Sequence, residues 1–181
     1  TTANAGSDRT LCQPSSSLAM AANTPTVGTG TWTQTGGPIT ATIANANNPT
    51  TGVSGMTTAG TYTFVWTITN APCPPSTDEM TITVAAPPAP FSIVGADACQ
   101  GSTITLTGPA GVNITYTWQR SLSGIAGSYT AFGGTAQTQQ VTTSGNYQLV
   151  VTNPAGCTAS DTAVVHIADY VFNGSISAGD P

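Results

Sequence analysis

The sequence contains no lysine, and its basic residues apart from one histidine are Arg9 and Arg120. Charged residues make up 5% of the chain, whereas an ordinary soluble domain has about 25%. Proteins that bind DNA or RNA draw much of their affinity from cationic side chains that contact phosphates. This composition therefore excludes nucleic acids as partners, and the lack of lysine excludes Schiff-base chemistry and lysine-dependent phosphate loops.

Long apolar runs and catalytic signatures are also missing. No run of about 18 apolar residues occurs, so we predict no membrane-spanning segment. The chain starts TTANAGSDRT, which lacks the features of a signal peptide, and we expect it to be a mature fragment of a longer protein. No G-x-S-x-G or H-E-x-x-H motif is present, and the single glutamate is Glu79. We therefore predict no enzymatic activity, no catalytic residues and no cofactor.

Threonine, about a fifth of the chain, takes the place of charge. It is β-branched, favours strands and gives a polar surface without charge. Apolar residues alternate with polar ones in STITLTG and in TYTFVWTIT, which has Tyr62, Phe64 and Trp66 on one face. Turn-forming clusters such as TQTGGP and NANNPTTG separate these segments. The pattern predicts an all-β fold of the β-sandwich type.

The same series of landmarks occurs twice along the chain. The matched pairs lie 84 to 87 residues apart: Cys12 and Cys99, Trp32 and Trp118, Gly60 and Gly145, Tyr62 and Tyr147, Cys73 and Cys157. We therefore predict two copies of one module, residues 1–86 and 87–168, followed by an extra segment, 169–181. The junction AAPPAP is rich in proline and is expected to be stiff.

The segments that carry these landmarks resemble a known module type. A tryptophan on an early strand, then TTAGTYTFVWTITNAPC or TTSGNYQLVVTNPAGC, is similar to immunoglobulin-like and polycystic-kidney-disease-like (PKD-like) modules. Residues 1–168 further resemble repeats of surface proteins that Bacteroidetes-type bacteria secrete by the type IX system, including gliding and adhesion proteins. The cysteine that antibody domains place two residues after the strand tyrosine is absent, because Phe64 and Leu149 stand there.

The resemblance implies two tandem immunoglobulin-like β-sandwiches in an extracellular protein at a bacterial surface. Such modules would form a stalk, an adhesin or a filament subunit, with neighbouring copies or adjacent modules as partners and a homopolymer as one form. The alternative is a carbohydrate-binding accessory module of a secreted hydrolase, with surface glycans as ligands. An exposed row of planar aromatic rings would distinguish this alternative.

The four cysteines, two in each copy, predict disulfides in an oxidising compartment. We expect Cys12 to pair with Cys73 and Cys99 with Cys157. Bridges between neighbouring modules, or free thiols, remain as alternatives, because two such positions in a sandwich can lie at opposite ends. No closely spaced cysteine pair is present, so we predict no metal site.

Several aromatic and polar residues are candidates for either a structural or a functional role. Trp32, Trp118, Tyr62 and Tyr147 are predicted core anchors, although the tryptophans, with Trp66, are also candidates for a sugar-stacking platform. His166 has no evident catalytic partner, and we expect it to be structural or exposed. The aspartates that recur near the cysteines are expected to cap turns, with Ca²⁺ ligation as the alternative. They are Asp8, Asp78, Asp97 and Asp161.

Two further segments suggest a modification and an interaction. Asp161–Ala163 reads DTA, a short pattern for bacterial O-glycosylation, which predicts a sugar on Thr162. The last segment could form a strand that begins a following domain or that is donated to a neighbouring subunit. The residues of this strand would be Tyr170, Val171, Phe172 and Ile176.

Overall fold

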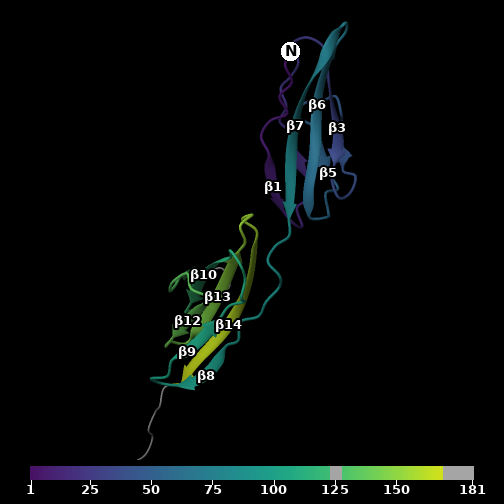
Figure 1. The fold of residues 1–181 in the computed structure, drawn as a ribbon. Helices are drawn as coiled ribbons and strands as arrows, with labels where there is room; N and C mark the ends of the chain where they lie inside the picture. Colours follow the sequence, from purple (N-terminus) through teal and green to yellow (C-terminus); the bar gives the residue numbers. More distant parts are fainter. Residues whose placement is uncertain (123–127, 169–181) are drawn as a thin grey trace, which may run out of the picture. The chain divides into compact units, whose positions relative to one another are not determined.

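The computed structural model describes residues 1–122 and 128–168, and within these ranges the chain forms strands and turns but no helix (Figure 1). The chain divides into two compact units. The first contains Thr1–Pro87 together with Ala155–Cys157, and the second contains Pro88–Pro154 and the described residues from Thr158 onward. Each unit is a sandwich of two sheets, and each is described by itself below.

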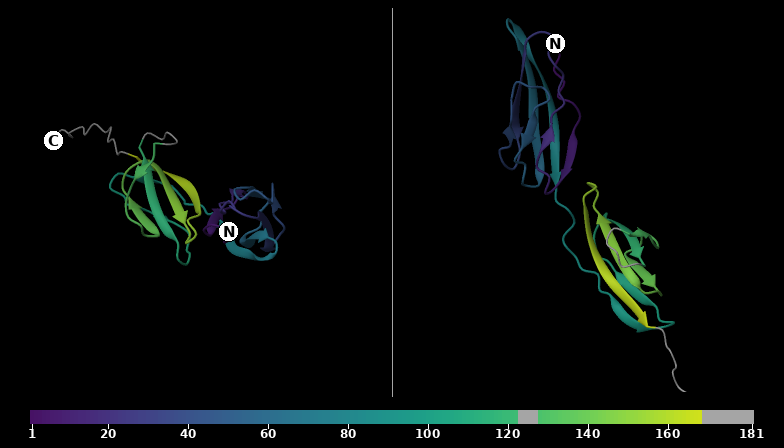
Figure 2. Two further views of the ribbon diagram at one scale, coloured as in Figure 1. Left: turned by 90° about the horizontal axis from the view of Figure 1, so that it is seen from above. Right: turned by 180° about the vertical axis from the view of Figure 1, so that it is seen from behind.

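The first unit is built around two long antiparallel strands, β6 and β7, which pair along most of their length. They lie in a four-stranded sheet of order β1-β7-β6-β3, and the second layer is a three-stranded sheet of order β2-β5-β4. Figure 2 shows the ribbon from two further sides. The strands are β1 (Arg9–Cys12), β2 (Leu18–Ala19), β3 (Thr29–Gly36), β4 (Thr42–Ile43), β5 (Gly52–Ser54), β6 (Gly60–Asn70) and β7 (Cys73–Ala85).

The second unit repeats this plan around the long antiparallel pair β13 and β14. Its sheets have the orders β11-β10-β13-β14-β8 and β12-β9. The strands are β8 (Ala96–Cys99), β9 (Ile104–Thr107), β10 (Thr115–Ser121), β11 (Thr130–Ala131), β12 (Thr138–Val141), β13 (Gly145–Thr152) and β14 (Thr158–Ala168). The prediction of an all-β fold made of immunoglobulin-like sandwiches is confirmed.

Both units place their first strand in parallel beside their last. In the first unit β1 pairs with the end of β7, from Arg9 opposite Ile82 to Cys12 opposite Ala85. In the second unit β8 pairs with the end of β14, from Ala96 opposite Val165 to Cys99 opposite Ala168. The first and the last strand of each unit are thus neighbours in one sheet.

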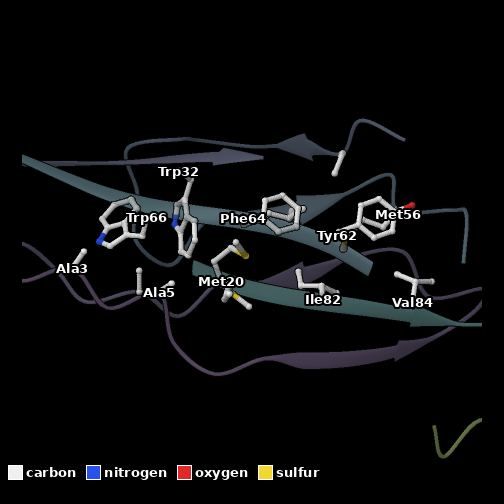
Figure 3. Close-up of a cluster of buried hydrophobic side chains, with 14 of the residues drawn as sticks. Ala3, Ala5, Met20, Trp32, Met56, Tyr62, Phe64, Trp66, Ile82 and Val84 are labelled. Atoms are coloured by element: carbon white, nitrogen blue, oxygen red, sulfur yellow. The ribbon is translucent and has the colours of Figure 1, made fainter. Parts of the chain in front are cut away.

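The core of the first unit follows from the alternation along β6 and β7. Every second residue of β6 from Tyr62 to Ile68 is buried, because successive side chains of a strand point to opposite faces. Trp32 of β3 stands opposite Trp66, and their ring centroids are 5.1 Å apart. Figure 3 shows these two indoles among the other buried side chains, with Ala3 of the N-terminal segment beside Trp66.

The core of the second unit uses the matching positions, and it keeps the tyrosine and one tryptophan of the first unit but not the second tryptophan. Tyr147, Leu149 and Val151 of β13 are fully buried, and Trp118 of β10 is opposite Leu149. Val151 stands where the first unit has Trp66. The ring of Phe132 packs edge-on against Tyr147, with centroids 5.4 Å apart, and supplies part of the aromatic bulk.

A glycine makes room for the additional tryptophan of the first unit. Gly30 of β3 is buried, and a Cβ atom at this position would collide with the six-membered ring of Trp66. The ring is enclosed on all sides and is fully buried, so it cannot move away without displacing its neighbours. The close approach of this backbone to the indole therefore requires glycine.

We expect Gly30→Ala to lower the free energy of unfolding of the first unit by about 1 to 3 kcal/mol, the usual cost of overpacking a core. Urea unfolding followed by tryptophan fluorescence measures this change. Gly52→Ala is the matched control, because a Cβ at Gly52 of β5 would meet nothing within 4 Å. Equal effects of the two substitutions would contradict the packing described here.

Candidate functional site

A tyrosine in each unit fixes the turn that precedes its own strand. The hydroxyl of Tyr62 donates a hydrogen bond to the carbonyl oxygen of Thr58 at 2.9 Å, and that of Tyr147 donates to the carbonyl oxygen of Thr143 at 2.8 Å. Both tyrosines are fully buried and both acceptors lie four residues upstream. This arrangement is the tyrosine corner of immunoglobulin-like sandwiches, so these two residues serve the fold.

All three tryptophans lie in the interior. Trp32 and Trp118 are 1% and 2% exposed, and their Nε1 atoms donate to the carbonyl oxygens of Pro49 (3.3 Å) and Ala136 (2.9 Å). Trp66 is also buried, and its Nε1 atom has no hydrogen-bond partner. Because the faces of these rings are covered by protein, the three tryptophans do not form a platform for sugars.

Three aspartates hold the N-terminal segment of a unit against its last long strand. In the first unit Asp78 of β7 accepts a hydrogen bond from the backbone N–H of Ala5 at 2.7 Å, and Asp8 accepts one from Thr81 at 2.8 Å. In the second unit Asp161 of β14 accepts one from the N–H of Ile93 at 2.8 Å. The expectation that these aspartates cap turns is wrong, because their carboxylates satisfy backbone groups of a neighbouring segment. Asp97 is exposed on β8.

The cysteines do not pair as expected from the sequence. Cys12, the last residue of β1, forms a disulfide with Cys157, and their Cα atoms are 5.4 Å apart. Cys73 and Cys99 are exposed free thiols. The predicted pairs Cys12–Cys73 and Cys99–Cys157 are therefore wrong. The physical reason is that Cys73 opens β7 while Cys12 lies beside its final residue, Ala85, so the length of β7 separates the two.

The remaining candidate residues do not assemble into a reactive centre. Thr162 and His166 are both exposed on β14, and Thr162 borders a shallow depression with Gly95, Asp97 and Val164. The predicted interaction strand with Tyr170, Val171, Phe172 and Ile176 lies outside the described residues.

The outward face of the β7-β6-β3 part of the first sheet is covered with threonine. Cross-strand neighbours on this face are both threonine at several places: Thr29 and Thr69, Thr31 and Thr67, Thr61 and Thr83, Thr63 and Thr81, and Thr67 and Thr77. The hydroxyls of Thr29 and Thr69 are 3.1 Å apart. Glu79 of β7 adds a carboxylate to this face. The face is therefore rich in hydroxyl groups and nearly uncharged.

Neither a metal cluster nor a membrane helix is found in the part of the chain that the structure describes. Over residues 1–122 and 128–168, no three His, Cys, Asp or Glu side chains come together in a way that could hold a metal ion. Over the same ranges no helix is long and apolar enough to cross a membrane.

One family model matches most of the first unit. Residues 5–84, less than half of the chain, match the family model for the K319L-like PKD domain. PKD-like and immunoglobulin-like domains are typically non-catalytic modules, of structural or adhesion type. The first unit is thus similar in sequence to a PKD domain. No curated protein matches the chain.

Solved structures that resemble the chain contain PKD or immunoglobulin domains. The PKD domain from the KIAA 1837 protein is 26% identical, with a TM-score of 0.43 over 49% of this chain and 90% of that one. The first two immunoglobulin domains of DIP-gamma are 13% identical, with a TM-score of 0.39 over 94% and 99%. The insect immune protein hemolin is 14% identical, with a TM-score of 0.43 over 91% and 46%. These TM-scores are low, so the fold is assigned from the strand order given above and not from these similarities.

We expect Asp161→Ala to destabilise the second unit by about 1 to 3 kcal/mol, because it removes a charge-assisted hydrogen bond and leaves the N–H of Ile93 without its acceptor. Hydrogen–deuterium exchange read by mass spectrometry would show faster exchange in β8 and β14. The matched control is Asp97→Ala, an exposed aspartate near the same strands, which should change stability by less than about 0.5 kcal/mol. Unchanged exchange in the Asp161 variant would show that the bond has no structural role.

Proposed function

We propose that this chain is a pair of structural repeat modules of a bacterial extracellular surface protein, where it forms part of a stalk, an adhesin or a filament subunit. The observation that supports this proposal is the duplicated scaffold. Each unit has its own tyrosine corner, its own indole-to-carbonyl hydrogen bond and its own aspartate that holds the N-terminal segment. Aspartate and tyrosine often act in catalysis, but here their side chains hydrogen-bond to the backbone and hold strands and turns in place. This use suits a module without a catalytic centre.

The chemistry of the surface supports an extracellular location. A disulfide persists in an oxidising compartment, and Cys12–Cys157 is of this kind. The threonine-covered face of the first sheet offers hydroxyl groups in place of charges, so its contacts with water and with neighbours would depend little on ionic strength. Such a surface suits a protein exposed to changing salt.

Thr162 fits the proposed role as a site of O-glycosylation. It lies on the exposed side of β14, within the sequence Asp161–Ala163, so its hydroxyl is open to a modifying enzyme. A sugar there would project from the sheet without disturbing the core, because the buried neighbour Ala163 points the other way.

The alternative, a carbohydrate-binding accessory module of a secreted hydrolase, is supported by no specific observation. Such modules stack sugars on exposed aromatic rings. In residues 1–122 and 128–168 every tryptophan is buried, and the other aromatic side chains are buried or half-buried. We therefore favour neighbouring copies or adjacent modules as the partners, rather than surface glycans.

Antibodies raised against the 181-residue chain should label intact, unpermeabilised cells of the organism that makes it, in immunogold micrographs. Negative-stain images of protein released from those cells should show extended particles or filaments, and a glycan array should give no saturable binding. Labelling that appears only after permeabilisation would contradict the surface location. A monomer that binds one polysaccharide saturably would favour the carbohydrate-binding alternative instead.

A further inference from the structure

The two free cysteines occupy the same positions, within their own repeats, as the two bonded ones. Cys12 and Cys99 are each the last residue of the first strand of a repeat, β1 and β8. Each lies opposite the last residue of the repeat's final strand, Ala85 for Cys12 and Ala168 for Cys99. These two cysteines are therefore equivalent in structure as well as in sequence.

The backbone that follows these two cysteines is also the same. The N–H of Gln13 donates to the carbonyl oxygen of Ala85 at 3.0 Å, and the N–H of Gln100 donates to that of Ala168 at 2.9 Å. The chain then turns back, with hydrogen bonds from Ser15 to Cys12 (2.9 Å) and from Ser102 to Cys99 (3.1 Å). Cys99 is thus held in the setting that Cys12 has, but its sulfur is exposed and unbonded.

Cys73 and Cys157 form the second equivalent pair. Cys73 is the first residue of β7 and lies opposite Asn70 in the hairpin between β6 and β7. Cys157 directly precedes β14 in the hairpin between β13 and β14. Cys157 is 1% exposed and bonded, whereas Cys73 is exposed and free.

The bonded pair defines a pairing rule between repeats. The first-strand cysteine of one repeat, Cys12, is bonded to the hairpin cysteine of the repeat that follows it in sequence, Cys157. If the second repeat follows the same rule, Cys99 bonds to the hairpin cysteine of a repeat that comes after it. If the first repeat follows it, Cys73 bonds to the first-strand cysteine of a repeat that comes before it.

We propose that Cys73 and Cys99 are linkage sites at which further modules of this kind attach by the same disulfide, so that repeats are joined covalently in a head-to-tail series. The partner supplies the complementary cysteine, and it is either another repeat of the same polypeptide or a second copy of this chain. Two thiols lose two protons and two electrons as the S–S bond forms. An external disulfide accepts the two protons and the two electrons and is reduced to two thiols. The inference rests on the proposed function in one respect, that the neighbours are modules of this kind.

The pairing is tested with the variants Cys73→Ser and Cys99→Ser. Each keeps the Cys12–Cys157 bond and a single free thiol, Cys99 in the first variant and Cys73 in the second. The two are mixed in equal amounts in a buffer of oxidised and reduced glutathione and analysed on non-reducing gels and by peptide mapping. Dimers that contain the Cys73–Cys99 bond should exceed all other dimers by at least about fivefold, whereas random pairing makes the two classes equal.

The unsubstituted chain should form a ladder of dimers and larger species that collapses on reduction, and the double variant Cys73→Ser/Cys99→Ser should stay monomeric. Both outcomes require folded protein, which hydrogen–deuterium exchange of the variants would verify. Three results would overturn the proposal: random pairing in the mixture, an unsubstituted chain that stays monomeric, or a Cys73–Cys99 bond within one monomer.

Peptide mapping of the native protein separates the two sources of the partner. Linked peptides in a species whose mass is that of one polypeptide indicate an adjacent repeat, and linked peptides in a reducible ladder indicate second copies. Surface labelling does not depend on these thiols. If the cysteines fail to pair while intact cells are labelled, the role as surface modules stands and the covalent linkage alone is wrong.

Discussion

The antiparallel pairing of the two longest strands in each unit is the interaction on which the rest of the structure depends. Strands β6 and β7, and likewise β13 and β14, alternate buried and exposed side chains along their length. This alternation supplies a large part of each core on one face. In the first unit it also gives the threonine-rich surface on the other face. The same pairs also position the two cysteines of each repeat, one in their connecting hairpin and one beside the end of the last strand.

The parts of the fold that could be predicted from the sequence are those set by local patterns. Alternation of apolar and polar residues identified the long strands, and the spacing of Trp32, Trp118, Tyr62 and Tyr147 identified the repeat. The alternation is a local signal, because consecutive residues of a strand point to its two faces. The repeat is detected by comparing two such segments with each other. The sequence therefore contained enough to place the sandwiches and their aromatic residues.

The parts that could not be predicted depend on contacts between distant segments. The spacing of the cysteines is compatible with several pairings, and only the register of β1 beside β7 shows why Cys12 does not reach Cys73. The aspartates gave a weak signal, since Asp78 and Asp161 recur at matching places, but their acceptor role required the N-terminal segment to be seen beside them. The space for Trp66 comes from Gly30 on another strand, a relation that neither residue reveals alone.

The parallel pairing of first and last strands bears on how a single unit would resist tension. In a parallel pair the start of one strand and the finish of the other lie at opposite ends of the shared ladder. Pulling on the two termini of a unit would therefore load all the backbone bonds between β1 and β7, or between β8 and β14, in shear at the same moment. An antiparallel arrangement of the same strands would instead peel apart one bond at a time, so the chain's geometry favours mechanical strength.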